Sequence, residues 1–332
     1  MAPCVTPLTN THPAGAPRAP EATPGAYPPP MPDRTLRLGH NPDPDDAFMW
    51  WPLADFTTDD GTVHRPQIDT AGYRFEHILE DIESLNQRSA RAELEITALS
   101  IHQFPHVAKD YVLTTCGSSM GDGYGPMIVT RPGHIAPDDI RSLKGKRLAV
   151  PGVRTTAWLS TQLCLAEHGL SADDLDWEPV MFDEIPARIA DGSFDAGVII
   201  HEGQITFERD GLALVRDLGA WWTRSRGLPL PLGGNAIRRD LIDAGEGPRI
   251  TRVLLNSIQH ALQHREQAVA FAMHWARGMD HTLADRFVGM YVNDWTLDYG
   301  ERGIQAVTQL LTEAKDANLI PAEAPIDFVR PG

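Results

Sequence analysis

An apolar run over residues 196–200 ends directly at His201 and Glu202, in the stretch DAGVIIHEGQ. A histidine at the end of a buried strand is partly desolvated, and burial keeps its imidazole neutral near pH 7 because it disfavours the charged form. A general base requires that neutral form, and it contributes about 10²–10⁴-fold to a rate. His201 is therefore a candidate base, and a structural histidine that ends a strand is the alternative. Glu202 would either orient the imidazole or point into solvent.

Two adjacent threonines, Thr155 and Thr156, stand where a helix is expected to begin, in VPGVRTTAW (150–158). The first N–H groups of a helix have no intrahelical acceptor, so together with the hydroxyls they could bind a carboxylate. An ordinary threonine N-cap is the alternative, although it needs only one of the two.

Another strand is expected to end at Ser100, in TALSIHQFPH (97–106), and is followed by His102 and His106. Pro105 disfavours the helix that would bring both histidines to one face. The spacing therefore argues against a zinc site.

The stretch GHNPDPDDAF (39–48) is dense in turn formers and carboxylates. Asp43, Asp45 and Asp46 could surround a hard cation, but the spacing of an EF-hand loop is absent. Acidic residues are favoured in the first turn of a helix, and this is the interpretation we prefer. The turn before them, which contains Asn41, could present N–H groups and an amide to a ligand.

Four glycines and two serines follow a strand in GSSMGDGYGP (117–126). Glycines allow the backbone to approach an anion closely. The loop lacks the GK[ST] ending of a P-loop and does not fit GxGxxG, which argues against a nucleotide-phosphate site. A ligand-lining loop and a plain turn between lobes both stay open.

These residues must be positioned by alternating strands and helices. Short β-rich runs occur at TLRLGH, EITALSIH, YVLTT, PMIVT, RLAVPG, PVMF and AGVII. Apolar residues at helical spacing from Phe75 to Leu85 predict a helix in GYRFEHILEDIESLNQRSA. Long amphipathic helices follow from about Pro248. The alternation predicts an α/β protein with mainly parallel sheets.

Two Pro/Gly-rich segments, 130–139 and 223–235, divide the α/β portions. They predict a discontinuous two-lobed protein, with 34–130 and 231–332 in lobe 1 and 131–230 in lobe 2. A ligand would bind between the lobes, at the carboxyl ends of the strands.

The chain has 332 residues and a formal net charge of −16, which argues against a nucleic-acid binder because such a protein needs a basic surface. Three cysteines without close spacing suggest a reducing compartment. Residues 1–33 are rich in proline and are expected to be a disordered tail without a secretory signal. No apolar run is long enough to insert in a membrane. We therefore expect a cytoplasmic protein.

Taken in order, GHNPDPDDAFMW, FEHILEDIESLN, ITALSIH, GSSMGDGYGP, AVPGVRTTAW, FDEIPARIADGSFDAGVIIHEGQ and DLGAWWTRSRGLPLPLGGNAIRRDL closely resemble the 1,4-dihydroxy-6-naphthoate synthase family of the futalosine route to menaquinone. The resemblance runs from about Thr35 to Val329. It implies a fold like the type 2 periplasmic binding proteins, with a central cleft and two hinge crossings. It also implies a lyase that cleaves cyclic de-hypoxanthine futalosine to 1,4-dihydroxy-6-naphthoate.

The resemblance implies a general base at the histidine of the IIHE motif, His201. It further implies substrate contacts, which we expect at Ala98, Leu99, Ser100, Thr155, Thr156, Asn41, Ser118 and Ser119. The GSSMGDG and GGN stretches are further candidates for ligand contacts. We expect no metal and no organic cofactor, because the substrate's own carbonyl can accept the electrons. The expected partner is a carboxylated, sugar-derived small molecule, and a homodimer is possible.

Two other functions fit parts of the same pattern. A solute-binding protein shares the fold and the cleft, but it would need an export signal or a lipid anchor. Chorismate dehydratase, a sister enzyme of the same pathway, is built on a related fold. The GHNPDPDDAF, GDGYGP and HEGQ stretches favour the naphthoate synthase.

Overall fold

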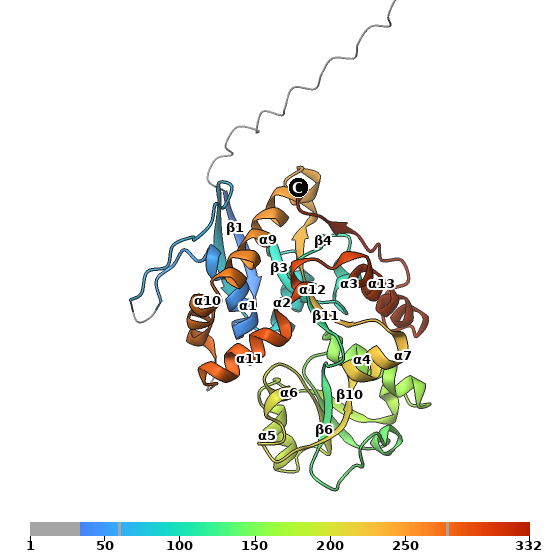
Figure 1. The fold of residues 1–332 in the computed structure, drawn as a ribbon. Helices are drawn as coiled ribbons and strands as arrows, with labels where there is room; N and C mark the ends of the chain where they lie inside the picture. Colours follow the sequence, from blue (N-terminus) through green and yellow to red (C-terminus); the bar gives the residue numbers. More distant parts are fainter. Residues whose placement is uncertain (1–33, 59–60, 277–278) are drawn as a thin grey trace, which may run out of the picture.

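A computed structural model of the chain describes residues 34–58, 61–276 and 279–332, so the predicted tail at 1–33 lies outside the described residues. Two sheets form two lobes (Figure 1). The larger sheet has seven strands in the order β12-β4-β11-β3-β1-β2, with β5 paired to β11, and the smaller sheet has five in the order β10-β6-β9-β7-β8. Within these residues no helix is both long and apolar enough to cross a membrane.

Lobe 1 contains the larger sheet and most of the helices. Its strands are β1 (Arg34–His40), β2 (Tyr73–Leu79), β3 (Ile96–Ser100), β4 (Tyr111–Thr114), β5 (Ser119–Gly121), β11 (Leu230–Arg238) and β12 (Phe328–Val329). Its helices are α1 (Pro44–Trp50), η1 (Trp51–Leu53), α2 (Ile82–Ser89), α3 (Phe104–Val107), α8 (Arg239–Asp243), α9 (Gly247–Gln263), α10 (Arg265–Ala272), η4 (Met273–Trp275), α11 (His281–Tyr291), α12 (Asp294–Leu297) and α13 (Gly300–Asp316).

Lobe 2 contains the smaller sheet. Its strands are β6 (Met127–Thr130), β7 (Arg147–Val150), β8 (Asp176–Pro179), β9 (Ala196–Ile199) and β10 (Ala213–Asp217). Its helices are η2 (Ile140–Leu143), α4 (Thr156–Glu167), η3 (Ala172–Asp174), α5 (Ile185–Ala190), α6 (Gly203–Thr206) and α7 (Leu218–Arg226). Both sheets are mixed rather than mainly parallel, because β11 runs antiparallel to β3, β4 and β5, and β6 runs antiparallel to β9 and β10.

The helix predicted from Phe75 to Leu85 is wrong over its first half. Residues 73–79 form the edge strand β2, parallel to β1, and α2 begins only after Asp81, whose side chain caps the N–H groups of Glu83 and Ser84. Tyr73 and Phe75 are buried, whereas Arg74 and Glu76 are exposed. This alternation is typical of a strand with one face on the core.

The first lobe crossing also differs from the prediction. The predicted lobe boundary puts strand β6 in lobe 1, but β6 pairs with β9 and β10 of lobe 2. The chain therefore crosses at 122–126 rather than at 130–139. The return lies between α7 and β11, inside the predicted segment 223–235. A Cβ atom on Gly219 would lie 1.8 Å from the carbonyl oxygen of Tyr124, so only glycine allows α7 to pack against the first crossing.

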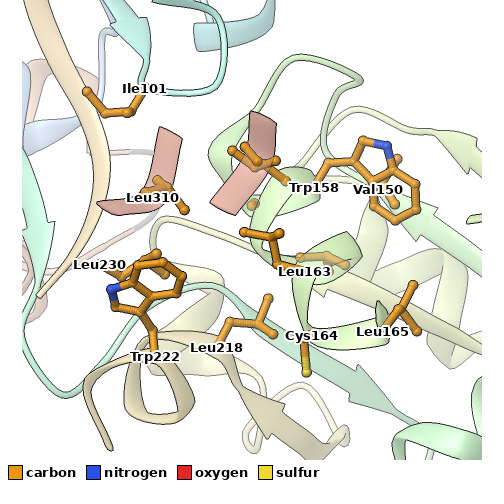
Figure 2. Close-up of a cluster of buried hydrophobic side chains, with 14 of the residues drawn as sticks. Ile101, Val150, Trp158, Leu163, Cys164, Leu165, Leu218, Trp222, Leu230 and Leu310 are labelled. Carbon is orange, nitrogen blue, oxygen red and sulfur yellow. The ribbon is translucent and has the colours of Figure 1, made fainter. Parts of the chain in front are cut away.

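A continuous apolar core joins the lobes on the side of the crossings. Figure 2 shows Leu163 of α4 among Leu218 and Trp222 of α7, Leu230 of β11 and Leu310 of α13, all of which are buried. Fully burying one such leucine contributes about 1.5–3 kcal/mol. Helix α4 therefore packs against both sheets, and its N-terminus is held at the boundary between the lobes.

Candidate active site

A cavity of about 740 Å³, including the part open to solvent, lies between the lobes. Both lobes contribute to its walls, which are lined by Asn41, Asp45, Asp46, Ile82, Ala98, Leu99, Ser100, Gly117, Ser119, Pro126, Thr155, Thr156, Ala157, Ile200, His201, Gln204, Leu232, Gly233, Gly234, Asn235 and Tyr291.

His201 follows β9 of lobe 2 and lines this cavity. Its backbone φ is 53°, in the left-handed region that non-glycine residues rarely adopt and that is often found at functional sites. Its ring packs edge-on against Phe182, with ring centroids 4.9 Å apart, and its side chain is 18% exposed. The imidazole is thus partly desolvated and held at the cavity wall.

The group that orients His201 is Asp43, from lobe 1. Its Oδ2 atom lies 3.0 Å from His201 Nδ1, and the carboxylate is 2% exposed. Asp43 is the N-cap residue of α1, yet its side chain makes no capping hydrogen bond. The expectation that this residue serves to start the helix is therefore wrong for its side chain. Glu202, considered earlier as the orienting group, lines a second cavity within lobe 2 instead.

Two more carboxyl groups of the first turn of α1, Asp45 and Asp46, line the cavity. Burial and the neighbouring Asp43 charge raise the pKa of Asp45 to about 6, although His201 acts in the opposite direction. Burial and Asp45 also raise the pKa of Asp46 well above its ordinary value. Asp46 accepts a 2.9 Å hydrogen bond from the N–H of Asn41. This wall of the cavity is therefore rich in carboxyl groups that retain protons more readily than exposed ones.

Asn41 lies at the end of β1 and is held by its neighbours. Its Oδ1 atom accepts from the Asp43 N–H at 3.1 Å, and its carbonyl accepts from His40 Nδ1 at 2.8 Å. His40 Nε2 in turn lies 2.9 Å from His77 Nδ1. The Asn41 Nδ2 group is buried and has no hydrogen-bond partner within the described residues. A buried donor of this kind requires an explanation, and a ligand oxygen would supply one.

The end of β3 brings Ala98, Leu99 and Ser100 to the cavity. Asn86 fixes Ser100 in two ways, because its Oδ1 atom accepts the Ser100 N–H at 2.9 Å and its Nδ2 donates to Ser100 Oγ at 3.1 Å. The Ser100 hydroxyl proton is left available, since that oxygen acts as an acceptor toward Asn86.

Thr155 and Thr156 reach the cavity from the N-terminus of α4. Both hydroxyl protons are already used: Thr155 donates to the Gly152 carbonyl at 2.8 Å, and Thr156 donates to the Leu232 carbonyl at 2.6 Å. The first intrahelical bond is donated by Leu159 to the Thr155 carbonyl, and the described part of the chain offers no acceptor for the N–H groups of Thr156 and Ala157. What this turn could offer a carboxylate is therefore its N–H groups rather than its hydroxyls.

The glycine-rich loop contributes only some of its predicted contacts. Gly117 and Ser119 line the cavity, whereas the Ser118 hydroxyl donates to the Trp295 carbonyl at 3.1 Å and is absent from the wall. Asn235, in the GGN stretch, donates from Nδ2 to the Gly117 carbonyl at 2.7 Å. Its Oδ1 atom is buried without a partner among the residues described.

Several lining residues were not predicted. Gln204 and Tyr291 form a 2.5 Å hydrogen bond across the cavity between α6 of lobe 2 and α11 of lobe 1. Gln204 is part of the HEGQ stretch and could have been found there. Tyr291 belongs to an amphipathic helix and carries no signal that separates it from a core residue. Over residues 34–58, 61–276 and 279–332, no group of three His, Cys, Asp or Glu side chains is arranged to hold a metal ion.

The sequence is similar to enzymes of one biosynthetic route. A family described as Menaquinone biosynthesis matches residues 36–316. The 1,4-dihydroxy-6-naphthoate synthase of Thermus thermophilus is 36% identical over 88% of this chain and 98% of its own length. That of Streptomyces coelicolor is 34% identical over 88% of this chain and 96% of its own.

Solved structures show the same architecture. A protein of Archaeoglobus fulgidus aligns with a TM-score of 0.73 and 38% identity, over 86% of this chain and 98% of its own. The alkanesulfonate-binding protein of Xanthomonas axonopodis pv. citri aligns with a TM-score of 0.66 over 90% of this chain and 99% of its own, at 14% identity, which shows the fold alone. The predicted two-lobed, periplasmic-binding-protein-like fold is confirmed.

Proposed function

The chain belongs to the menaquinone biosynthesis family and is an enzyme of that pathway, and we propose that it cleaves cyclic de-hypoxanthine futalosine to 1,4-dihydroxy-6-naphthoate with His201 as general base. The observation that carries this proposal is the contact between His201 and Asp43 at a cavity between the lobes. A carboxylate at Nδ1 favours the tautomer with its proton on that nitrogen, which leaves the lone pair on Nε2.

The proposed reaction begins when Nε2 of His201 takes the proton of a substrate hydroxyl. The alkoxide electrons form a carbonyl, the adjacent carbon–carbon bond breaks, and its electron pair moves toward the carbonyl of the ring that remains. The sugar-derived part, which now carries the new carbonyl, leaves. Its loss allows the second ring of the remaining part to become aromatic, and this drives the step. The protonated imidazole then lies beside the Asp43 carboxylate, which stabilises its positive charge in a site with little water.

The two walls of the cavity would orient the substrate. A substrate carboxylate is disfavoured at the wall formed by Asp45 and Asp46, next to the buried Asp43 carboxylate. It is attracted by the N–H groups and the positive dipole end of α4 at Thr156 and Ala157. The partnerless Asn41 Nδ2 and Asn235 Oδ1 atoms offer one donor and one acceptor for substrate oxygens. Ser100 and Ser119 would complete the polar contacts.

The experiment is turnover by the purified full-length protein, followed by mass spectrometry of the product. We expect naphthoate from cyclic de-hypoxanthine futalosine and no turnover of chorismate. The variant His201→Ala should lose roughly 10²–10⁴-fold in kcat. A His201→Ala protein that forms naphthoate at close to the parent rate would exclude this residue as the base. Turnover of chorismate instead would identify the sister activity.

A cytoplasmic location and a homodimer remain predictions. Cell fractionation checks the first, and light scattering of the purified protein checks the second. Recovery in a secreted fraction would favour the solute-binding alternative.

A further inference from the structure

The two histidines after β3, His102 and His106, hold the beginning of α4 although they belong to the other lobe. The His102 N–H donates to Thr156 Oγ1 at 3.2 Å, and His102 Nδ1 donates to the Thr155 carbonyl at 3.1 Å. His102, Thr155 and Thr156 are each 2% exposed, so these bonds are shielded from water. Neither histidine lines the cavity.

The backbone N–H of His102 helps to fix the direction of the Thr156 hydroxyl. Thr156 Oγ1 accepts from the His102 N–H, and its own proton goes to the Leu232 carbonyl of β11. Two groups of lobe 1 therefore use the proton and one of the two lone pairs of this hydroxyl. What remains for a ligand at this turn is the pair of backbone N–H groups of Thr156 and Ala157.

His106 makes a second bond between the lobes. Its partner is Arg154, the residue before the two threonines. The Nε2 atom of His106 accepts from Arg154 Nη1 at 2.8 Å, so this ring is neutral at that nitrogen. The Arg154 N–H in turn donates to the Glu83 carboxylate of α2 at 3.3 Å. Residues 154–156 of lobe 2 are thus tied to lobe 1 at each position.

We propose that His102 is a positioning residue for the ligand-binding turn: from lobe 1 it holds the Thr155–Thr156 turn of lobe 2, so that the free N–H groups are fixed for the substrate carboxylate. The inference rests on the proposed function for the role of that turn. His102 does not touch the substrate. Its effect is on binding, because it fixes a contact that is made equally in the ground state and the transition state.

Three variants separate this role from simple packing. His102→Asn places an amide N–H close to the position of Nδ1, so it can still donate to the Thr155 carbonyl. His102→Leu fills similar space but removes the second donor to that carbonyl, which then keeps only the helical bond from the Leu159 N–H. His102→Gln places its amide one carbon further along the side chain, too far to donate to the Thr155 carbonyl. It should therefore behave like His102→Leu, and it replaces that variant in the test if the leucine protein does not fold.

Substrate affinity is measured by calorimetry in a His201→Ala background, where turnover is expected to be roughly 10²–10⁴-fold slower. Adding His102→Leu or His102→Gln should weaken binding roughly tenfold, and His102→Asn should stay within about threefold of the His201→Ala parent. In the active protein the same leucine or glutamine variant should raise KM and leave kcat within about twofold. Equal affinity for all four proteins would overturn the proposal, as would an asparagine variant that is weakened as much as the leucine variant.

A ligand-free measurement separates failure of this inference from failure of the proposed function. Hydrogen exchange of a peptide that covers 154–158 should be at least tenfold faster in His102→Leu than in the parent, and unchanged in His102→Asn. Faster exchange together with no binding of cyclic de-hypoxanthine futalosine to any variant would reject the proposed substrate but retain the hold on the turn. Unchanged exchange in His102→Leu would reject the hold by the His102 side chain, since the backbone N–H of residue 102 still bonds to Thr156 Oγ1 in that variant.

Discussion

Asp43 and His201 belong to different lobes, yet Asp43 Oδ2 lies 3.0 Å from His201 Nδ1 at the wall of the cavity. The proposed base and the carboxylate beside it therefore come from different lobes, and they touch because the two lobes are close together in this structure. A protein with open lobes would hold His201 without its partner. Closure over the substrate would in this way complete the catalytic pair at the same moment that it excludes water.

Replacement of the orienting carboxylate should affect kcat much more than KM. We expect Asp43→Asn to lower kcat by roughly 10²–10⁴-fold, because an amide stabilises neither the Nδ1–H tautomer nor the imidazolium. Steady-state kinetics at pH 7 measures the effect. Glu202→Gln is the matched control and should keep kcat within about twofold, since Glu202 lines the other cavity. The reverse pattern would make Glu202 the orienting group.

Two adjacent serines should separate cavity contacts from structural ones. Ser119 lines the cavity, so Ser119→Ala should raise KM by roughly fivefold with little change in the free energy of unfolding. The Ser118 hydroxyl donates to Trp295 instead, so Ser118→Ala should reduce the free energy of unfolding by about 1 kcal/mol and leave KM unchanged. Urea denaturation measures the free energy of unfolding of both variants, and steady-state kinetics measures their KM. A raised KM in Ser118→Ala would contradict a purely structural role for Ser118.

Gly219, which packs against the backbone of the first lobe crossing, should not accept any side chain. A Cβ at Gly219 would lie 1.8 Å from the Tyr124 carbonyl oxygen, so Gly219→Ala should reduce the free energy of unfolding by more than about 2 kcal/mol. Gly289, inside α11, provides the control, because a Cβ there would lie 3.4 Å from the Arg265 guanidinium. Gly289→Ala should be neutral or stabilise the protein by roughly 0.5–1 kcal/mol. Equal urea midpoints for the two variants would show that the crossing can move aside.

Stability should depend on His102 in mildly acidic solution. Burial lowers the pKa of His102 from its ordinary 6.5 to about 4, with the Arg154 charge acting in the same direction and the bond to the Thr155 carbonyl in the opposite one. Between these pH values the unfolded chain binds a proton that the folded chain does not, so the folded state loses stability as the pH falls from 6.5 to 4. His102→Asn does not titrate, and its free energy of unfolding should fall less steeply, by up to about 1.4 kcal/mol per pH unit. Parallel pH profiles for both proteins would contradict the lowered pKa.

The sequence located the strands that carry the site better than it located their partners. The runs that end at His40, Ser100 and Ile199 were all predicted as strands, because apolar β-rich residues are followed by turn formers. The residues after those strands meet at one cavity, as the carboxyl ends of strands in an α/β fold often do. Their roles as substrate contacts stay predictions.

What could not be predicted depends on distant contacts. Asp43 is followed by a helix, so local propensity favours a cap, and only the tertiary structure brings His201 to its carboxylate. The sequence of strand β2 predicts a helix because Phe75, Ile78 and Leu79 also fit a 3.6-residue period. Its pairing with β1 at the sheet edge decides the outcome, and that pairing is not encoded within the segment itself.

A single apolar core includes residues of α4, α7, β11 and α13. The two lobes are therefore not separate packing units where these elements meet. If one lobe unfolded alone, it would expose the apolar surface of the other lobe to water. Heating should therefore produce one calorimetric peak in place of two. The lobes share their core on this side, and the cavity lies between them elsewhere.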